Sequence, residues 1–293
     1  MTASTLVTVA YRTTALDLSW VPDSVDVIVV HNDDSLALEA VRHPNVRHLH
    51  SEGNVGFGAA VNAALAVVTT ARIVLCNPDA QATPEHWTAL TDAGDDEVVV
   101  VPLLDGAGGR TSVVNAYPTP LSALLTGYRA GRLLPRGTSL RRLLSLALGR
   151  WGRTHTALTE AREGRWPLRT HWASGALVSL PTARVRDGGG FDPAYFLYME
   201  DVDLCARMAQ RHDGMSVRMA AVEPARHAVS ASSGTGAQRA VVDHHYASSV
   251  RRYMRGRRGP GWRLAAVLMT PRLAFLGLRL RLRRDRSATA AVH

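Results

Sequence analysis

The sequence predicts an α/β fold, with a mostly parallel sheet that is covered by helices on both faces. Short apolar runs rich in β-branched residues recur through the first hundred positions, and polar turns follow them. Strands that are apolar throughout are typical of parallel sheets buried on both faces. Segments with helical composition lie between these runs, and strands alternating with helices are the pattern of a layered α/β domain.

The individual elements follow in chain order. Five segments are expected to be strands: Leu6–Tyr11 (LVTVAY), Val25–Val30 (VDVIVV), Val46–His50, Arg72–Cys76 (RIVLC) and Val98–Leu103 (VVVVPL). Two segments are expected to be helices: Leu36–Val41 and the Ala-rich and Leu-rich Ala59–Val68. The strand and helix signals return at His171–Val217.

Composition changes suggest how the chain is divided. We expect one domain over residues 1–250, made of an N-terminal half (1–104), a basic helical insertion (118–167) and a C-terminal half (168–250). Residues 251–293 form an arginine-rich amphipathic tail whose last residues are expected to be disordered. No internal repeat is visible.

The charge balance limits the classes of partner. The 293-residue chain has a net charge of +9, and all 34 of its basic side chains are arginines. Such an excess favours anionic partners: phosphates, nucleic acid or acidic lipid surfaces. The two distant cysteines, Cys76 and Cys205, do not form a disulfide framework, and neither a signal peptide nor a membrane-spanning run is evident. These features predict a cytoplasmic protein.

The first candidate for chemistry is Asn77-Pro78-Asp79, directly after the strand Arg72–Cys76. Ligands of such sheets bind beyond the carboxyl ends of the strands. A carboxylate there can hold a divalent cation that bridges the two phosphates of a nucleotide sugar. Taken alone, an ordinary turn that ends a strand is the more frequent explanation of this motif.

The second candidate is an acidic cluster at Glu200 to Asp203, which follows the motif Gly190-Phe191-Asp192 and an aromatic run. Sugar transfer with inversion needs a base that takes the proton of the acceptor hydroxyl. A carboxylate at a helix N-terminus suits that task. The alternative is that these carboxylates only complement the helix dipole.

Two weaker signals complete the set. Asn54-Val55-Gly56-Phe57-Gly58 leads into a helix, and glycines let a backbone approach a phosphate closely; a structural turn is the alternative. His227 is able to complete a metal site as a neutral imidazole, although any one of twelve histidines is more often structural.

In this order, the segments resemble family 2 glycosyltransferases, which have the GT-A fold. The resemblance covers roughly Leu6 to Tyr253 and is carried by VTVAY, NVGFGAAVN, NPDA and SGALVSLPTARVRDGGGFDPAYFLYMEDVDLCARM. The last block is specific, because GGFD followed by aromatic residues and EDVDL is a hallmark of the family. The arrangement is most similar to bacterial rhamnosyltransferases that use dTDP-L-rhamnose, especially actinobacterial enzymes acting on polyprenyl-diphosphate-linked GlcNAc.

The resemblance implies roles for individual residues. Asp201 is implied as the catalytic base with Glu200 beside it, and Asp79 and His227 as ligands of Mg²⁺ or Mn²⁺. The implied donor site contains Val9, Ala10, Tyr11, Asn32, Asn54, Gly56, Asn77 and Asp79. The implied acceptor site contains Trp172, Ser174 and Gly175. Asn77 replaces the first carboxylate of a DxD-like motif, as also occurs in the rhamnosyltransferase-like branch of the family. One position departs from the pattern: His31 replaces an Asp that faces the nucleotide base.

The expected function is therefore inverting sugar transfer, with L-rhamnose from dTDP-L-rhamnose and a glycan or polyprenyl-diphosphate-linked acceptor. The alternative within the class is a UDP-linked or GDP-linked sugar and a secondary-metabolite or other polysaccharide acceptor. A nucleotidyltransferase would carry a glycine-rich and lysine-rich N-terminal loop, which is absent, and the intact Asp79 and Asp201 argue against a catalytically dead binder. No RNA-binding signature or DNA-reading helix is evident, so nucleic acid is not an expected partner.

The tail suggests a further partner. Apolar residues from Trp262 to Leu280 interleave with Arg263, Arg272, Arg279 and Arg281, as in helices that lie in a membrane interface. Pro271 is expected to kink this helix. A solvated charged face is the alternative. With a lipid-linked acceptor, the pattern predicts peripheral binding to the inner face of the cell membrane.

Overall fold

The computed structural model describes residues 3–129, 158, 161–228 and 236–290. Contacts divide the chain into two compact units. Unit 1 comprises Met1–Tyr117, Thr154–Phe196 and Glu200–Ser232. Unit 2 comprises Pro118–Arg153, Leu197–Met199 and Ser233–His293.

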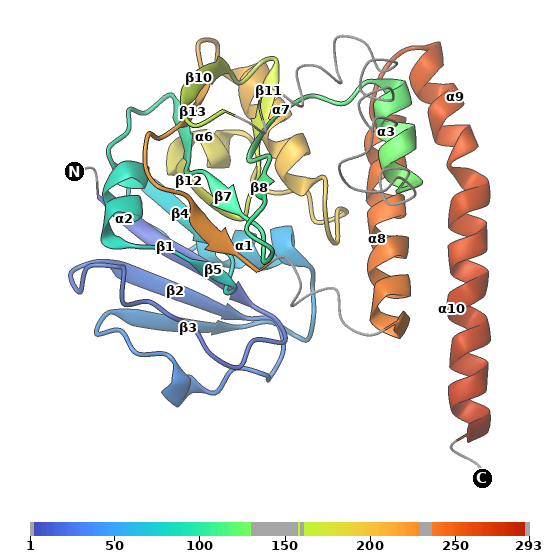
Figure 1. The fold of residues 1–293 in the computed structure, drawn as a ribbon, viewed down its shortest axis with the longest axis horizontal. Helices are drawn as coiled ribbons and strands as arrows, with labels where there is room; N and C mark the ends of the chain where they lie inside the picture. Colours follow the sequence, from blue (N-terminus) through green and yellow to red (C-terminus); the bar gives the residue numbers. More distant parts are fainter. Residues whose placement is uncertain (1–2, 130–157, 159–160, 229–235, 291–293) are drawn as a thin grey trace. The chain divides into compact units, whose positions relative to one another are not determined.

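Unit 1 is built on an eight-stranded sheet (Figure 1). Its strands, in spatial order, are β10 (Gly164–Pro167), β13 (Ser216–Met219), β6 (Glu97–Val100), β12 (Leu177–Pro181), β4 (Arg72–Cys76), β1 (Ser4–Ala10), β2 (Asp26–His31) and β3 (Val46–His50). β12 runs antiparallel to β4 and β6, and β10 runs antiparallel to β13. The other pairs are parallel, so the predicted mostly parallel sheet is confirmed.

Two smaller sheets extend unit 1. One has the order β5 (Ala80–Gln81), β14 (Ala225–His227), β7 (Leu103–Leu104) and β8 (Arg110–Thr111); the other pairs β11 (His171–Ala173) with β9 (Val114–Ala116). In the first, β14 pairs antiparallel with β5, and His227 lies opposite Ala80. This register brings His227 beside the residues that follow β4.

The helices of unit 1 are α1 (Phe57–Leu65), α2 (Pro84–Thr91), α6 (Thr182–Asp187) and α7 (Glu200–Arg211). The predicted helix at Leu36–Val41 is wrong: only a single 3-10 turn, η1 (Leu38–Ala40), forms there. Its N-cap residue Ala37 makes no side-chain capping bond, whereas α2 begins with a capping box between Thr83 and His86. An uncapped segment this short does not propagate a helix.

The strand predictions agree closely with the structure, because apolar composition decides burial. Every residue of β1 and β4 is buried, as expected for strands covered on both faces. The bounds at 46–50 and 72–76 match, and the first two strands shift by a residue or two. The predicted strand at 98–103 is split, because Pro102 has no amide hydrogen for the ladder.

Unit 2 is helical, with α3 (Pro120–Gly127), α8 (Gly236–Arg255), α9 (Pro260–Leu268) and α10 (Thr270–Ala290). Met269, between α9 and α10, is buried against Gly127, where an added Cβ would lie 2.7 Å from the Met269 Cε. The Tyr128 hydroxyl donates to the Leu268 carbonyl at 2.7 Å. The loop and helix junctions therefore hold the described helices of this unit together.

Several predicted boundaries fall inside or outside these elements. The proposed domain limit at residue 250 lies within α8, and the end of the predicted insertion at 118–167 is β10 of unit 1. Most of that insertion, 130–157 and 159–160, lies outside the described residues. The chain breaks between α9 and α10, and Pro271 lies in the first turn of α10. α10 continues to Ala290, so a disordered end would lie at 291–293, outside the described residues.

None of the helices in the described part of the chain is long and apolar enough to cross a membrane.

Candidate active site

The polar residues after β4 meet His227. Asp79 lies just before β5, which pairs with β14, and the Asp79 Oδ1 is 3.1 Å from the His227 Nε2. The Asn77 Nδ2 is also 3.1 Å from this nitrogen. The Ala228 amide donates to the Asp79 carbonyl at 3.2 Å, which fixes the two segments. Three predicted residues, two of which lie 150 positions apart in sequence, thus form one cluster.

This cluster has the chemistry of a partial metal site. The carboxylate of Asp79 and the imidazole of His227 are both half-buried, and such oxygen and nitrogen donors suit Mg²⁺ or Mn²⁺. No group of three or more His, Cys, Asp or Glu side chains arranged to hold a metal occurs within the described ranges. The residues present therefore fit a cation that completes its coordination with ligand oxygens and water.

The acidic cluster begins α7. The Asp201 Oδ1 accepts from the Val202 amide at 2.8 Å, and its Oδ2 accepts from the Gly175 amide at 3.3 Å. Glu200 is only 7% exposed, and its Oε2 has no hydrogen-bond partner in the part of the chain that the structure describes. Tyr198 and Met199, with φ of 67° and 69°, form the left-handed backbone that leads into the helix.

Burial perturbs both carboxyl groups. Burial raises the pKa of Asp201 to about 6, although the Val202 and Gly175 amides act in the opposite direction. Burial and the neighbouring Asp201 charge raise the pKa of Glu200 well above its usual range. With a pKa of about 6, Asp201 is therefore mostly an ionised carboxylate at neutral pH. A carboxylate with a pKa near 6 is well matched to general-base chemistry.

The two acidic sites border the same short stretch of backbone. Gly175 donates to the Asp201 carboxylate, and the next residue, Ala176, accepts from the Asn77 amide at 2.8 Å. β12 begins at Leu177, which lies opposite Cys76 at the end of β4. Asp201 and the Asn77–Asp79 turn are thus brought to one end of the central strands, where α/β sheets bind ligands.

The loop before α1 is held by a network of asparagines. The Asn32 Nδ2 donates to the Asn54 Oδ1 at 2.9 Å, and the Val55 amide donates to the Asn32 Oδ1 at 3.0 Å. The Gly56 amide donates to the Asn54 Oδ1 at 3.1 Å. The structure thus brings the predicted donor residues Asn32, Asn54 and Gly56 together. These hydrogen bonds of the two asparagine side chains shape the loop.

Gly56 has a structural reason to be glycine. Its φ of 89° is left-handed, and an added Cβ would lie 2.5 Å from the Phe196 carbonyl oxygen. The Phe57 amide donates to that same carbonyl at 3.2 Å. The glycine motif is therefore docked on the aromatic run that precedes the acidic cluster.

Asn62, the last residue of the block NVGFGAAVN, joins the same two motifs, and the sequence assigned it no role. Its Nδ2 donates to the Phe191 carbonyl at 2.7 Å, and its Oδ1 accepts from the Phe191 amide at 2.8 Å. An added Cβ at Gly58 would lie 2.8 Å from the Phe191 Cβ, so the helix and the GGFD segment are in close contact. The only signal in the sequence is an asparagine inside an otherwise apolar helix.

The end of β1 carries the remaining predicted donor residues. Val9 and Ala10 are buried, the Ala10 carbonyl accepts from the Asn32 amide at 2.8 Å, and Tyr11 is exposed beyond the strand. The Arg12 Cζ lies 5.4 Å from the Tyr11 ring centroid. An exposed aromatic ring at the carboxyl end of a central strand is able to stack on a planar ligand.

Three histidines form a cluster that the sequence did not reveal. The His31 Nε2 is 2.8 Å from the His48 Nδ1, and the His31 ring stacks on His50 with centroids 4.6 Å apart. Burial, followed by the neighbouring histidines, lowers the pKa of His31; burial and His50 lower that of His48. Asp33, two residues after His31, accepts from the Arg12 amide at 2.9 Å.

The predicted acceptor residues lie on β11 and the loop that follows it. The Trp172 Nε1 donates to the Ala116 carbonyl at 3.2 Å, and the Ser174 amide donates to the Val113 carbonyl at 2.8 Å. Gly175 contacts Asp201, as described above. These residues therefore border the acidic cluster, while their role toward an acceptor stays a prediction.

The sequence of this chain is similar to that of known glycosyltransferases. Residues 16–138 match the model of glycosyl transferase family 2. The chain is 27% identical over 239 residues to the N-acetylglucosaminyl-diphospho-decaprenol L-rhamnosyltransferase of Mycobacterium tuberculosis, with the same values for strains CDC 1551 and H37Rv. The match covers 76% of this chain and 71% of the relative. The resemblance stated from the sequence is confirmed.

Solved structures bear on the fold alone. The mannosyltransferase PcManGT from Pyrobaculum calidifontis, solved in complex with GDP-Man and Mn²⁺, is similar with a TM-score of 0.50 and 14% identity. The similarity covers 100% of this chain and 81% of that one. The predicted α/β fold of the GT-A type is confirmed.

Proposed function

We propose that this chain, which carries a glycosyl transferase family 2 domain, transfers a sugar with inversion from a nucleoside-diphosphate donor to an acceptor hydroxyl. One observation carries the proposal. The Asn77–Asp79 turn, in which Asp79 pairs with His227, and the Asp201 carboxylate border the same backbone stretch at the carboxyl end of β4. One group suits the donor diphosphate and the other suits the acceptor hydroxyl.

Asp201 is the proposed base. As the acceptor oxygen forms its bond to the anomeric carbon, the bond from that carbon to the diphosphate breaks. The nucleoside diphosphate leaves with the electron pair, and the Asp201 carboxylate takes the acceptor proton. The Gly175 and Val202 amides orient this carboxylate, and burial keeps its pKa near 6, so it is ionised and still basic at neutral pH.

Asp79 and His227 are the proposed metal-binding residues. A divalent cation, when bound, supplies positive charge that stabilises the leaving diphosphate. The Asn77 amide contacts the same His227 Nε2 that faces Asp79, so a cation bound to this nitrogen would take the place of that contact.

We propose dTDP-L-rhamnose as the donor and a polyprenyl-diphosphate-linked sugar as the acceptor. Support comes from the relative, whose name states that it is an L-rhamnosyltransferase of N-acetylglucosaminyl-diphospho-decaprenol. A UDP-linked or GDP-linked sugar is the alternative. The carboxylate that faces the nucleotide base in the family pattern is replaced here by His31, which contacts His48 and His50.

A donor screen tests the proposal. The purified chain is incubated with dTDP-, UDP- and GDP-sugars, with and without Mg²⁺ or Mn²⁺, and the released nucleoside diphosphate is measured. We expect metal-dependent hydrolysis that is strongest with dTDP-L-rhamnose. Preference for a UDP-sugar or GDP-sugar would retain the reaction class and reject the donor. If no nucleotide sugar released its nucleoside diphosphate under any condition, even with the acceptor supplied, the proposed reaction would be rejected.

A further inference from the structure

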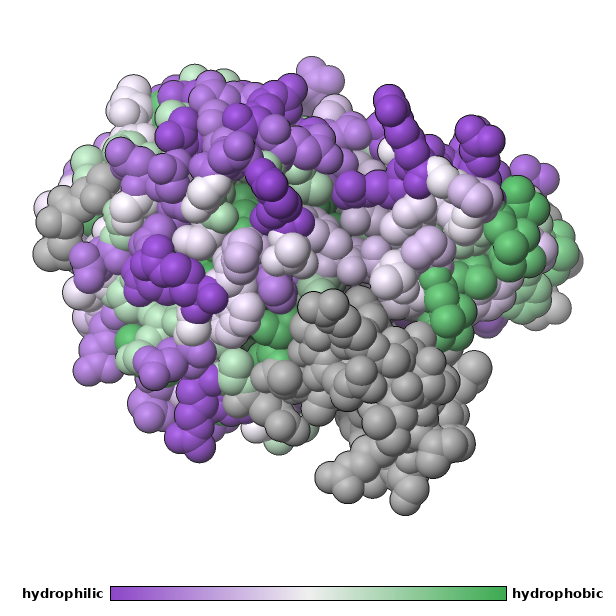
Figure 2. All heavy atoms as spheres, turned by 90° about the horizontal axis from the view of Figure 1, so that it is seen from above, coloured by the Kyte–Doolittle hydropathy of each residue, from purple (hydrophilic) through white to green (hydrophobic). Residues whose placement is uncertain are grey.

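We propose that an exposed apolar stripe on α9 and α10 docks onto an anionic lipid surface. The stripe consists of Leu264, Val267, Leu268, Phe275, Leu278 and Leu282, whose side chains are between 45% and 65% exposed. Figure 2 shows apolar side chains gathered at the right-hand end of the view, where these helices lie. Six large exposed apolar side chains on two consecutive helices are more than the scattered exposed residues of an ordinary surface.

The stripe is a second apolar face, distinct from the face that packs inside unit 2. Phe275, Leu278 and Leu282 lie within about 60° of one another around α10, at 3.6 residues per turn. Leu276 is fully buried and Leu273 is half-buried, on the opposite side of the same helix. One face of α10 thus completes the helical unit, and the other is left uncovered in the described chain.

Arginines flank the stripe on both sides. Arg263, Arg279 and Arg281 are exposed, and the Arg279 Cζ lies 5.7 Å from the Phe275 ring centroid. The sequence from 260 to 282 contains four arginines and no acidic residue. Long cationic side chains beside an inserted apolar face reach back to the phosphates of lipid head groups.

Charge selects the lipid surface over a second copy of the chain. Within α10, the spacing of Phe275, Leu278 and Leu282 is also that of a coiled-coil seam. Two copies would bring arginines together without an acidic residue at 260–282 to pair with them. An anionic surface compensates the same arginines. Since no described helix is able to span a bilayer, the stripe would lie in the plane of the interface.

The inference deepens the proposed function and rests on it for one point, the lipid-linked acceptor. A helix of 21 residues is about 32 Å long, so a docked α10 would hold the enzyme along the surface that contains such an acceptor. The docking itself requires only the stripe and its arginines. The hydrolysis of a nucleotide sugar in solution requires neither, so the two proposals are separable.

The test is co-sedimentation of the full chain with vesicles of phosphatidylcholine, with or without phosphatidylglycerol. We expect binding to the anionic vesicles only. Leu278→Asp removes an apolar side chain that would insert into the lipid, and it adds a negative charge that the anionic surface repels. It should weaken that binding at least about tenfold. The matched control is Leu121→Asp on α3 of the same unit, because the two leucines are equally exposed, at 54% and 56%. The control should bind like the parent.

A second variant keeps the test valid if Leu278→Asp disturbs the helix. Arg279→Gln with Arg281→Gln leaves the apolar stripe unchanged and should weaken binding by about fivefold per arginine at low salt. Circular dichroism and donor hydrolysis in solution should be unchanged in all three variants.

Three results would overturn the inference. The first is equal binding to neutral and anionic vesicles, and the second is equal binding by Leu278→Asp and Leu121→Asp. The third is a mass, measured by light scattering without vesicles, that falls from dimer to monomer on Leu278→Asp, which would assign the stripe to a second copy. Loss of donor hydrolysis in the parent chain would instead count against the proposed function.

Discussion

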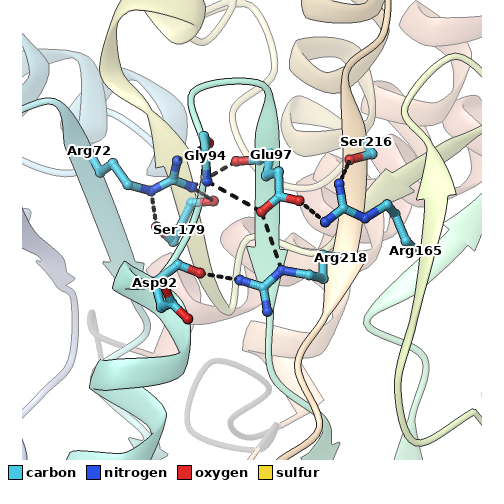
Figure 3. A network of polar contacts seen from close by, with 8 residues as sticks. All are labelled: Arg72, Asp92, Gly94, Glu97, Arg165, Ser179, Ser216 and Arg218. Carbon is cyan, nitrogen blue, oxygen red and sulfur yellow. Dashed lines mark hydrogen bonds and ion pairs between the residues drawn. The ribbon is translucent and has the colours of Figure 1, made fainter. Parts of the chain in front are cut away.

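The two ends of the large sheet in unit 1 both carry charged side chains, but the pairing of those charges differs. Near the amino ends of β4 and β6, Arg72 and Glu97 form a network with Arg218 of β13 and Arg165 of β10 (Figure 3). At the carboxyl end of β4, Asp79, His227 and the Glu200–Asp201 pair form the candidate active site. The comparison separates charges that stabilise the fold from charges that are available for chemistry.

At the amino end, every charge has a partner. Arg72 is fully buried, and its guanidinium donates to the Ser179 Oγ at 2.9 Å, the Gly94 carbonyl at 2.8 Å and the Glu97 carbonyl at 2.7 Å. Burial lowers its pKa to about 10, which still leaves it charged at neutral pH. The Glu97 carboxylate contacts both Arg165 and Arg218. Glu97, Arg165 and Arg218 line a cavity of ≈ 590 Å³, yet their charges pair with one another.

At the carboxyl end, by contrast, the pairing is incomplete. Glu200 has an oxygen without a hydrogen-bond partner among the described residues, and burial raises the pKa of both carboxyl groups. Groups that a fold keeps in an unfavourable state are frequent at functional sites. A hollow with charged walls is therefore weaker evidence for a site than a few buried polar groups that lack partners.

The largest expected effect lies at the carboxyl end. Asp201→Asn should lower turnover about 10²–10⁴-fold, because the amide cannot accept the acceptor proton, while donor binding is retained. Steady-state kinetics and nucleotide titration measure the two quantities. Asp203→Asn, in the same helical turn but paired with Arg207, is the matched control and should keep near-parent turnover. Near-parent turnover in Asp201→Asn would remove the assignment of the base.

At the amino end, Arg72→Leu should destabilise the protein without a direct effect on donor affinity. It removes the donor from the buried Ser179 Oγ and from the Gly94 and Glu97 carbonyls, so we expect a loss of about 3 kcal/mol in the free energy of unfolding. Urea denaturation measures this change. Arg165→Gln, at a side chain that is 58% exposed, should cost less than about 1 kcal/mol. Equal costs would show that the network does not depend on burial.

Removing the charge of Asp201 should have the opposite effect on stability. Because its pKa is raised from 3.8 to about 6, the folded state binds more protons than the unfolded state between these values. The free energy of unfolding therefore falls as pH rises through this window, and the cost is complete above pH about 6. Asp201→Asn should be more stable than the parent by on the order of 1–3 kcal/mol at pH about 8, and similar at pH about 4.

Thermal unfolding across this pH range checks the prediction. Over the same range, kcat/KM of the parent should fall as pH drops below about 6, because the base becomes protonated. A variant that is less stable than the parent at every pH would contradict a strained carboxylate at this position.

The smallest expected effect concerns the metal pair. Asp79→Ala and His227→Ala should each weaken metal-dependent donor binding by about tenfold or more, since each removes one of two proposed protein ligands. Isothermal titration with nucleoside diphosphate, with and without Mn²⁺, measures this change. Asp105→Ala, at an exposed turn outside the site, is the control. Metal-independent affinity that falls equally in all three variants would argue against a cation at this pair.

Much of the core of the fold was predictable from the sequence, because strand position follows from apolar composition. The segments Val46–His50 and Arg72–Cys76 match the structure, and the sheet is mostly parallel as expected. The helix expected at Leu36–Val41 was wrong, since helix formation in a short segment depends on caps and packing that composition does not contain. The role of Asn62 and the histidine cluster escaped notice because their partners lie on other elements.

The sequence by itself determined the residue types of the site: carboxylates after β4 and at the start of α7, a glycine loop, and a histidine near the end of unit 1. Only the tertiary structure decided that Asp79 meets His227, that Asn77 and Asp201 share one backbone stretch, and that Glu200 is buried without a full set of partners. The physical reason is that local propensity acts over a few residues. Strand pairing, in contrast, joins positions more than a hundred residues apart and sets both their geometry and their solvation.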